Sequence, residues 1–471
     1  MSEMFDLNLI EGVYNKFGNE IERIYNNRNE IIWELDDGSN DYLWVEPDES
    51  MIGTGSNYIG FVKVNKPPYN ETNMPQNSIQ YSFDGINWEY MPYDEHSEID
   101  EIEITQKTYF RYVPDVFIRH RIIGRHATSS SGWDKFKCSV GGSLHKYMNN
   151  VYYNEILFGL YKDESLIRST PFFLGIAIID ASKLHVDYYK NDNVMPYGYH
   201  YMFANQLFMT KPPIIHMKKV ESNGCFGMFE DCTSLVNAPE LPATTLADGC
   251  YNSMFFGCTS LVNAPELPAT TLYERCYASM FRDCTSLVNA PELTATTLAS
   301  NCYNSMFFGC TSLVNAPELP ATTLYERCYA SMFYRCTSLV TAPALPATIL
   351  EKSCYSSMFD GCNSLVNAPE LPATTLAEFC YAYMFEGCTS LKYSPILIAR
   401  QLVNYCYKQM FYNCNSLSYI YCYAENPTVG LDEWVYNVSN KGEFKKLKDV
   451  EWPTGVNGIP ENWFIFTEQN T

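Results

Sequence analysis

A Met-Phe pair recurs at a fixed spacing of 26 residues through half of this chain. The nine methionines are Met202, Met228, Met254, Met280, Met306, Met332, Met358, Met384 and Met410. The phrase around each pair is nearly constant and is clearest as CYNSMFFGCTSLVNAPELPATTL at Cys250–Leu272. Such a period is typical of a solenoid, in which each unit buries its apolar side chains only against its neighbours. We therefore expect a stacked rod, and we look for its function on the regular outer surface.

Each unit divides into a compact half and an extended half. In CYxxMFxxC the apolar residues occupy positions 1, 2, 5, 6 and 9, which predicts a short helix with one buried stripe. TSLVNAPELP then predicts a brief strand, because its prolines cannot donate to a ladder. Three strand residues are expected to point inward: Leu235, Ala238 and Leu241. Three others are expected on the outer face: Val236, Asn237 and Glu240. The fold class predicted is an α/β solenoid of nine units.

The cysteines follow the same period. One series is Cys225, Cys250, Cys276, Cys302, Cys328, Cys354, Cys380 and Cys406. The other is Cys232, Cys258, Cys284, Cys310, Cys336, Cys362, Cys388 and Cys414, and only Cys138 and Cys422 lie outside both series. Cysteines eight residues apart on a helix are separated by roughly 12 Å, which is too far for a disulfide. We expect buried, small apolar side chains, and the spacing does not suit zinc.

The part before the rod has the pattern of β structure. Short alternating runs beside Asn- or Gly-rich turns predict strands near the N-terminus, and IQYSFDGINWEY at Ile79–Tyr90 predicts a hairpin that turns at Asp84-Gly85. The spacing of Ser82, Asp84 and Trp88 is similar to an Asp-box but one residue short; we expect turn structure there, with ligand contact as the alternative. The domains expected are a short β motif at 1–48, a β-sandwich-like region at 49–125, a mixed transition segment at 126–197, the solenoid at 198–421 and a C-terminal cap at 422–471.

Charge limits the partners. The net charge of −22 and the pI near 4.7 disfavour nucleic acid, since phosphates would be repelled. No window reaches the ~20 apolar residues of a membrane span, so membrane insertion is not expected. The N-terminus, MSEMFDLNLIEGVYNKF, is acidic where a signal peptide is basic, which favours an intracellular chain or a virion protein released by lysis.

No catalytic constellation is evident in the sequence. There is no G-x-S-x-G, H-E-x-x-H or P-loop, and no histidine falls within the regular array from Met228 onward. The basic cluster at His120–His126 is interpreted as a solvated strand or loop, and the acidic run SEIDEIEI as a half-buried strand. We expect a protein that is not an enzyme and that binds no cofactor or metal. An active site within residues 118–197 is the alternative.

The repeated outer face is the candidate binding ridge. Its residues are Asn237, Glu240, Asn263, Glu266, Asn289, Glu292, Asn315, Glu318, Asn367 and Glu370, and Ala344 and Ile396 interrupt the glutamates. Stacked carboxylates repel by ~1 kcal/mol per neighbouring pair in water. The ridge therefore suits a basic or hydroxyl-rich repetitive ligand or divalent cations, unless duplication merely copied a solubilising residue. The variable loops before each compact half, together with the positions after each Met-Phe, are a second candidate edge.

The unit MFxGCTSLxxAPELPATTLxxxCY resembles the BspA-like leucine-rich repeat of gut Bacteroidales and their phages. The phrase YSFDGINWEY…TYFRY resembles the β region that often precedes such arrays, and the tail resembles their C-terminal cap, so the resemblance spans roughly residues 58–471. It implies a leucine-rich-repeat solenoid for adhesion and surface recognition, with no catalytic residues. NKFGNEIERIYNNRNEIIWEL is similar to short β repeats at the start of phage tail and virion proteins.

These observations predict a non-enzymatic phage virion component of the tail-fibre or receptor-binding type. Its rod would contact a host cell-surface glycan or protein, while the N-terminus would join other virion structural proteins. A bacterial cell-surface or secreted BspA-like adhesin is the alternative. The sequence leaves a homo-oligomer open.

Overall fold

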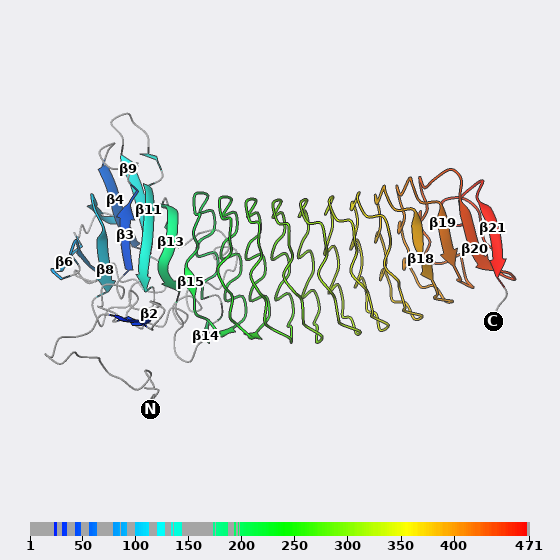
Figure 1. The fold of residues 1–471 in the computed structure, drawn as a ribbon, viewed down its shortest axis with the longest axis horizontal. Helices are drawn as coiled ribbons and strands as arrows, with labels where there is room; N and C mark the ends of the chain where they lie inside the picture. The colour runs from blue at the N-terminus through cyan, green and yellow to red at the C-terminus, as the bar shows by residue number, and fades with distance from the viewer. Residues whose placement is uncertain are drawn as a thin grey trace, which may run out of the picture.

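The structure is a computed structural model of the 471-residue chain. It describes residues 23–25, 31–34, 43–48, 56–63, 79–84, 86–91, 99–112, 120–127, 133–134, 136–143, 173–174, 176–186, 193–194, 196 and 198–468. Small β-sheets at one end lead into a long solenoid of about ten turns, and the C-terminus lies at the far end of the rod (Figure 1).

A seven-stranded sheet adjoins the solenoid in the order β15-β13-β11-β3-β8-β5-β6. Its strands are β3 (Leu43–Pro47), β5 (Ile79–Ser82), β6 (Glu89–Tyr90), β8 (Thr108–Tyr112), β11 (Phe136–Ser143), β13 (Ile176–Val186) and β15 (Ile214–Ile215). Pairing is antiparallel from β6 to β11 and parallel from β11 to β15. The hairpin predicted at Ile79–Tyr90 is confirmed, since β5 pairs with β6.

A second sheet has the order β10-β9-β4-β7, and β12 also pairs with β9. Its strands are β4 (Ser56–Lys63), β7 (Ile99–Glu103), β9 (His120–Ala127), β10 (Trp133–Asp134) and β12 (Phe173–Leu174). In the acidic run around β7, Ile102 and Ile104 are buried and Glu103 is exposed, as expected of a half-buried strand. Nearer the N-terminus, β1 (Arg23–Tyr25) pairs with β2 (Ile31–Glu34).

The compact half of each unit is a ribbon of consecutive turns, and the helix predicted there is wrong. No helix occurs among the described residues, so the α/β class is corrected to a β-solenoid. Successive amides alternate between two kinds of partner. The amide of Met254 donates to the carbonyl of Tyr251 three residues back (3.2 Å), whereas that of Phe255 donates to the carbonyl of Met280 in the next unit (2.9 Å). Half of the amides in the ribbon therefore donate hydrogen bonds to a neighbouring unit, because buried amides need acceptors.

A positive φ at every fourth residue produces this ribbon. In one unit the left-handed residues are Gly249, Ser253 and Gly257, with φ of 61°, 56° and 71°. Because a Cβ is disfavoured there, glycine, asparagine and aspartate are common at such positions. The apolar spacing of CYxxMFxxC has a period of four, which an α-helix of 3.6 residues per turn fits nearly as well over nine residues. That similarity explains the error.

Identical side chains stack along the rod to form its core. The phenylalanines of successive Met-Phe pairs lie nearly parallel, with ring centroids 5.7 Å apart between Phe281 and Phe307 and 5.6 Å between Phe307 and Phe333. The tyrosines of each CY pair form a second buried stack, with Tyr277 and Tyr303 5.8 Å apart. Each methionine from Met228 to Met410 is fully buried. The solenoid predicted from the 26-residue period is thus present.

Parallel pairing closes the opposite side of the rod. A short sheet has the order β14-β16-β17, formed by β14 (Asn193–Val194), β16 (Lys219–Val220) and β17 (Thr245–Leu246). Single parallel bridges then link the units until a four-stranded sheet, β18-β19-β20-β21, ends the rod. Its strands are β18 (Tyr393–Leu397), β19 (Tyr419–Cys422), β20 (Glu443–Leu447) and β21 (Phe464–Glu468). Parallel rungs therefore continue beyond residue 421, where the sequence predicts the cap to begin.

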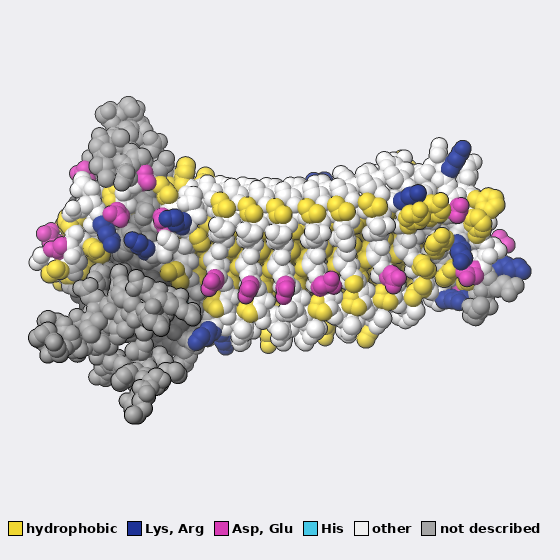
Figure 2. All heavy atoms as spheres, viewed as in Figure 1, with side chains coloured by type: hydrophobic (Ala, Val, Ile, Leu, Met, Phe, Trp, Pro, Cys, Tyr) yellow, Lys and Arg dark blue, Asp and Glu magenta, His cyan; other side chains and the backbone are white. Residues whose placement is uncertain are grey.

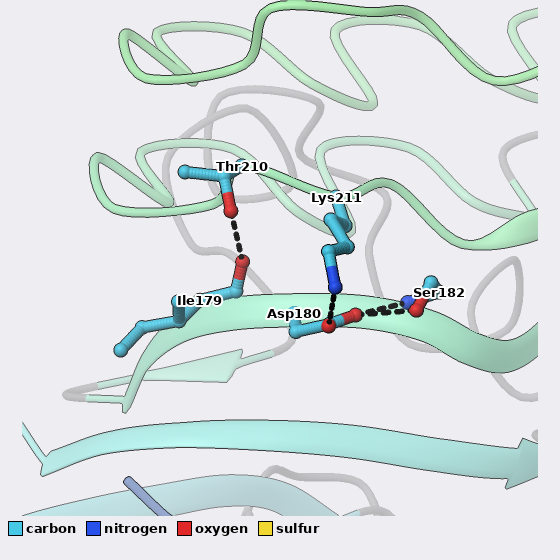
Figure 3. Close-up of polar contacts among 5 residues, drawn as sticks. All are labelled: Ile179, Asp180, Ser182, Thr210 and Lys211. Carbon is cyan, nitrogen blue, oxygen red and sulfur yellow. Dashed lines mark hydrogen bonds and ion pairs between the residues drawn. The ribbon is translucent and has the colours of Figure 1, made fainter.

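Both ends of the core are closed. At the N-terminal end the amide of Thr210 donates to the carbonyl of Ile179 on β13. The Thr210 hydroxyl donates to the same carbonyl at 3.2 Å, and Lys211 pairs with Asp180 at 2.7 Å (Figure 3). The backbone bonds join the sheet to the rod, since an exposed ion pair adds little. Buried Gln206 accepts a hydrogen bond from the amide of Ile178. At the other end the fully buried Trp434 lies where a Met-Phe pair would stand.

Candidate interaction surface

The extended half of each unit places alternate side chains inside and outside the rod. Leu235 and Leu241 are buried and Ala238 packs against the core, as predicted from the sequence. Val236 and Glu240 are exposed on the outer face. The amide of Val262 donates to the carbonyl of Val236 at 3.0 Å, which fixes one extended run beside the next. The outer side chains consequently form straight rows with one member per unit.

The asparagines of the candidate ridge form one continuous row. Each pairs in parallel with its counterpart in the next unit, in the order Asn237, Asn263, Asn289, Asn315, Thr341, Asn367 and Tyr393. The five asparagine side chains are exposed. The structure therefore brings these predicted residues together in a register that neighbouring backbones hold.

The glutamates form a second row, which we call the glutamate row. Its members are Glu240, Glu266, Glu292, Glu318 and Glu370, all of them exposed, with Ala344 in the gap. Figure 2 shows a line of acidic side chains (magenta) along one face of the rod. Within the described residues, none of these carboxylates lies in an ion pair with a lysine, arginine or histidine. The row is thus a line of negative charge that the rod itself does not neutralise.

A row of valines runs parallel to the glutamates and was not among the predicted site residues. This valine row comprises Val236, Val262, Val288, Val314, Val340 and Val366. All but the half-buried Val262 are exposed, by 39% (Val314) to 46% (Val340) of their surface. Figure 2 shows a line of hydrophobic side chains (yellow) beside the acidic one. The signal was available in the sequence, since a valine precedes each ridge asparagine.

The side chains that follow each Met-Phe pair, which the sequence predicts as part of a second binding edge, largely pack against one another. The Arg282 guanidinium lies 4.1 Å from the ring centroid of Phe308, and Phe308 stacks on Tyr334 at 4.4 Å. Such cation–π and ring contacts stabilise the column itself.

Burial raises the pKa of Glu230 to about 7, with a further contribution from the charge of Asp231. Burial beside Glu386 likewise raises the pKa of Asp360 to about 7.

The variable loops of that edge are more open. Tyr273 and Tyr325 are exposed in two loops with the same Tyr-Glu-Arg sequence. In these loops Arg275 lies 3.5 Å from Glu274, and Arg327 lies 3.9 Å from Glu326. The cations and anions of this edge therefore pair locally, in contrast to the glutamate row.

The seventeen cysteines whose side chains the structure describes are buried and unpaired, as predicted. Burial raises the pKa of Cys232 to about 12, and its thiol donates to the carbonyl of Phe203 at 3.1 Å. A thiol is nucleophilic or metal-binding only as thiolate, so these side chains act as core residues. Among the described residues, no three histidine, cysteine or acidic side chains cluster closely enough to hold a metal ion.

The Asp-box-like phrase is a turn device, as predicted. The Asp84 carboxylate accepts hydrogen bonds from the amides of Ile86 (2.8 Å) and Asn87 (2.7 Å) and from the Ser82 hydroxyl (2.8 Å). The backbone bond from Asn87 leads these contacts in holding the pKa of Asp84 well below its usual range. The carboxylate is thus already used within its own loop.

The alternative active site within residues 118–197 lies mostly outside the described side chains. Of the basic cluster, His120–Ala127 forms strand β9, which agrees with the strand interpretation. No described segment forms a helix of the length and apolarity that a bilayer crossing requires.

The repeats match a known family model. A model described as BspA type leucine rich repeat region (6 copies) matches residues 325–441 and 352–470. Residues 325–470 are thus similar to BspA-type leucine-rich repeats. The match covers the C-terminal part of the solenoid, and the same turn ribbon and buried stacks extend through the preceding units. Neither a curated protein nor a solved structure matches the chain.

Proposed function

We propose that this chain is a non-enzymatic recognition protein whose BspA-type solenoid contacts a glycan or protein on a bacterial surface. The observation that carries the proposal is the match of the repeats to a family with a protein-interaction or adhesion role. The rows of exposed side chains support it, because they repeat one chemistry many times along a rigid backbone. Repetition multiplies weak contacts into useful affinity.

For its location we propose a phage virion, as a tail-fibre or receptor-binding component. The resemblance of NKFGNEIERIYNNRNEIIWEL to phage tail proteins supports this, although most of that segment lies outside the described residues. The family match supports equally a cell-surface or secreted adhesin as the second candidate. Other virion proteins are the proposed partners of the N-terminus only in the first case.

Two measurements test these proposals. Fluorescently labelled full chain is titrated onto Bacteroidales cells, and saturable binding is expected; its absence on every strain tried refutes recognition. Mass spectrometry of purified, nuclease-treated phage particles then decides the location. Finding the chain in particles supports the virion proposal, whereas finding it only in the surface or secreted fraction of bacteria supports the adhesin.

A further inference from the structure

The outer face between the valine row and the glutamate row is amphipathic. One long edge presents apolar side chains and the other presents unpaired carboxylates, with the asparagines between them. Glu240 lies four Cα-to-Cα steps of extended chain after Val236, which sets the two rows at most about 14 Å apart. An α-helix with its side chains is about 10–12 Å wide. A single helix laid along the rod therefore reaches both rows.

The repeat distance of the rod is close to the pitch of an α-helix. Parallel pairing spaces the asparagine backbones by about 4.8 Å, and the core phenylalanines repeat every 5.5–5.8 Å. A helix advances about 5.4 Å per turn. One side chain per helical turn thus stays beside one unit over several turns, with a mismatch of about 0.6 Å per turn. An extended peptide repeats the same face every ~6.8 Å and loses register after a few units.

Charge and side-chain type narrow the choice of ligand class further. A second copy of this chain would bring a glutamate row toward another molecule with a net charge of −22, so the face does not suit self-association. A glycan would be expected to rest on aromatic rings. The three rows contain only valine, asparagine, glutamate, threonine and alanine between Val236 and Glu370. The face therefore favours a cationic protein segment with an apolar stripe.

We propose that this face binds a basic amphipathic α-helix of a partner protein, aligned with the rod axis. Its apolar stripe packs on the valine row and its lysines or arginines pair with the glutamate row. Four glutamates are consecutive, from Glu240 to Glu318, so the partner helix needs at least four basic turns, or about 15 residues. The inference rests on the proposed recognition function and names the class of ligand for that surface.

The test uses the full chain and a synthetic peptide of about 18 residues, with leucines on one helical stripe and lysines on the adjacent stripe. Three comparison probes are a scrambled peptide of the same composition, an alternating lysine–valine peptide and a chitosan oligosaccharide. Fluorescence anisotropy or calorimetry at physiological salt should give the helical peptide at least tenfold tighter binding than each comparison probe. Equal binding of the scrambled peptide, or tighter binding of the extended peptide or chitosan, overturns the proposal.

Matched variants locate the contact. The triple variant Glu266→Gln, Glu292→Gln and Glu318→Gln removes three charges from the glutamate row, and about a tenfold loss of affinity is expected for three exposed ion pairs. Glu274→Gln, Glu326→Gln and Glu351→Gln remove the same charge from exposed positions on the loop edge and should change affinity less than twofold. Equal losses in both variants would mean unspecific attraction and overturn the proposal.

A gain-of-function variant completes the set. Ala344→Glu fills the gap between Glu318 and Glu370 and should tighten binding of a longer peptide two- to threefold, because it adds one pair. Unchanged or weaker binding contradicts the row geometry. The cell-binding assay separates this inference from the proposed function. If cells bind the native chain and the row variant equally, recognition stands and the helix proposal falls.

Discussion

The turn ribbon predicts an unusual preference for glycine over alanine at Ser279 and Ser331. Both serines have φ near +54°, and they lie two units apart, so their effects should add. A left-handed backbone costs an L-residue ~1–2 kcal/mol, and glycine loses ~0.5–1 kcal/mol of entropy on folding. The balance leaves roughly 0.5–1 kcal/mol in favour of glycine per site. The Gly/Gly double variant should then be about 1–2 kcal/mol more stable than the Ala/Ala one.

If these serines lay in a helix, the stability difference between the Gly/Gly and Ala/Ala variants would have the opposite sign. In a helix interior alanine is favoured over glycine by ~1 kcal/mol per site, or about 2 kcal/mol for the pair. Urea denaturation followed by tryptophan fluorescence gives the free energies of unfolding, with the buried Trp434 among the reporters. If the Ala/Ala variant proves as stable as the Gly/Gly variant or more so, the ribbon geometry is refuted.

Two further serines in the same units provide the control. Ser286 and Ser338 are equally half-buried but do not have positive φ. At these positions glycine should be the less stable replacement, because only its entropic cost remains. The sign should therefore reverse between serines seven residues apart in the same unit.

Three other outcomes are expected. Phe307→Ala should cost ~3–5 kcal/mol in the same urea assay, because a fully buried ring between two stacked neighbours is lost; a loss below 1 kcal/mol would contradict the stack. The pKa of Asp360 is raised to about 7 from 3.8. The contribution of Asp360 to the stability of the folded protein is therefore greatest below pH 4 and declines as the pH rises to about 7. Asp360→Asn should therefore raise stability at pH 8 by on the order of 1–2 kcal/mol and leave it nearly unchanged at pH 4, as measured by urea denaturation at the two values. Iodoacetamide at pH 8 should leave the seventeen described cysteines unmodified until urea is added, as mass spectrometry of tryptic peptides can show.

The sequence predicts those features that depend on one unit and its period. The inward leucines, the outward Val236, Asn237 and Glu240, and the buried cysteines follow from alternation and repetition alone. The turn ribbon does not follow from them, because the spacing of apolar residues around Met254 and Phe255 fits a helix almost as well. The ribbon is favoured over the helix because the amide of Phe255 donates a hydrogen bond to the next unit, and this bond exists only in the stack. In the unit of Met254 the local signal for it was Gly249, Ser253 and Gly257 at every fourth position.

The candidate ridge illustrates a general difficulty with repeat proteins. Inner side chains must recur every 26 residues for the stacks to form, so duplication places outer side chains in rows whether or not a ligand exists. Interruptions are therefore more informative than the rows. In one unit Thr341 and Ala344 replace the usual asparagine and glutamate, while Val340 and the buried Leu339 and Leu345 are retained. Stability does not require Asn or Glu there, since the unit stacks without them. Binding measured with the gap filled can therefore separate a ligand contact from a residue copied by duplication.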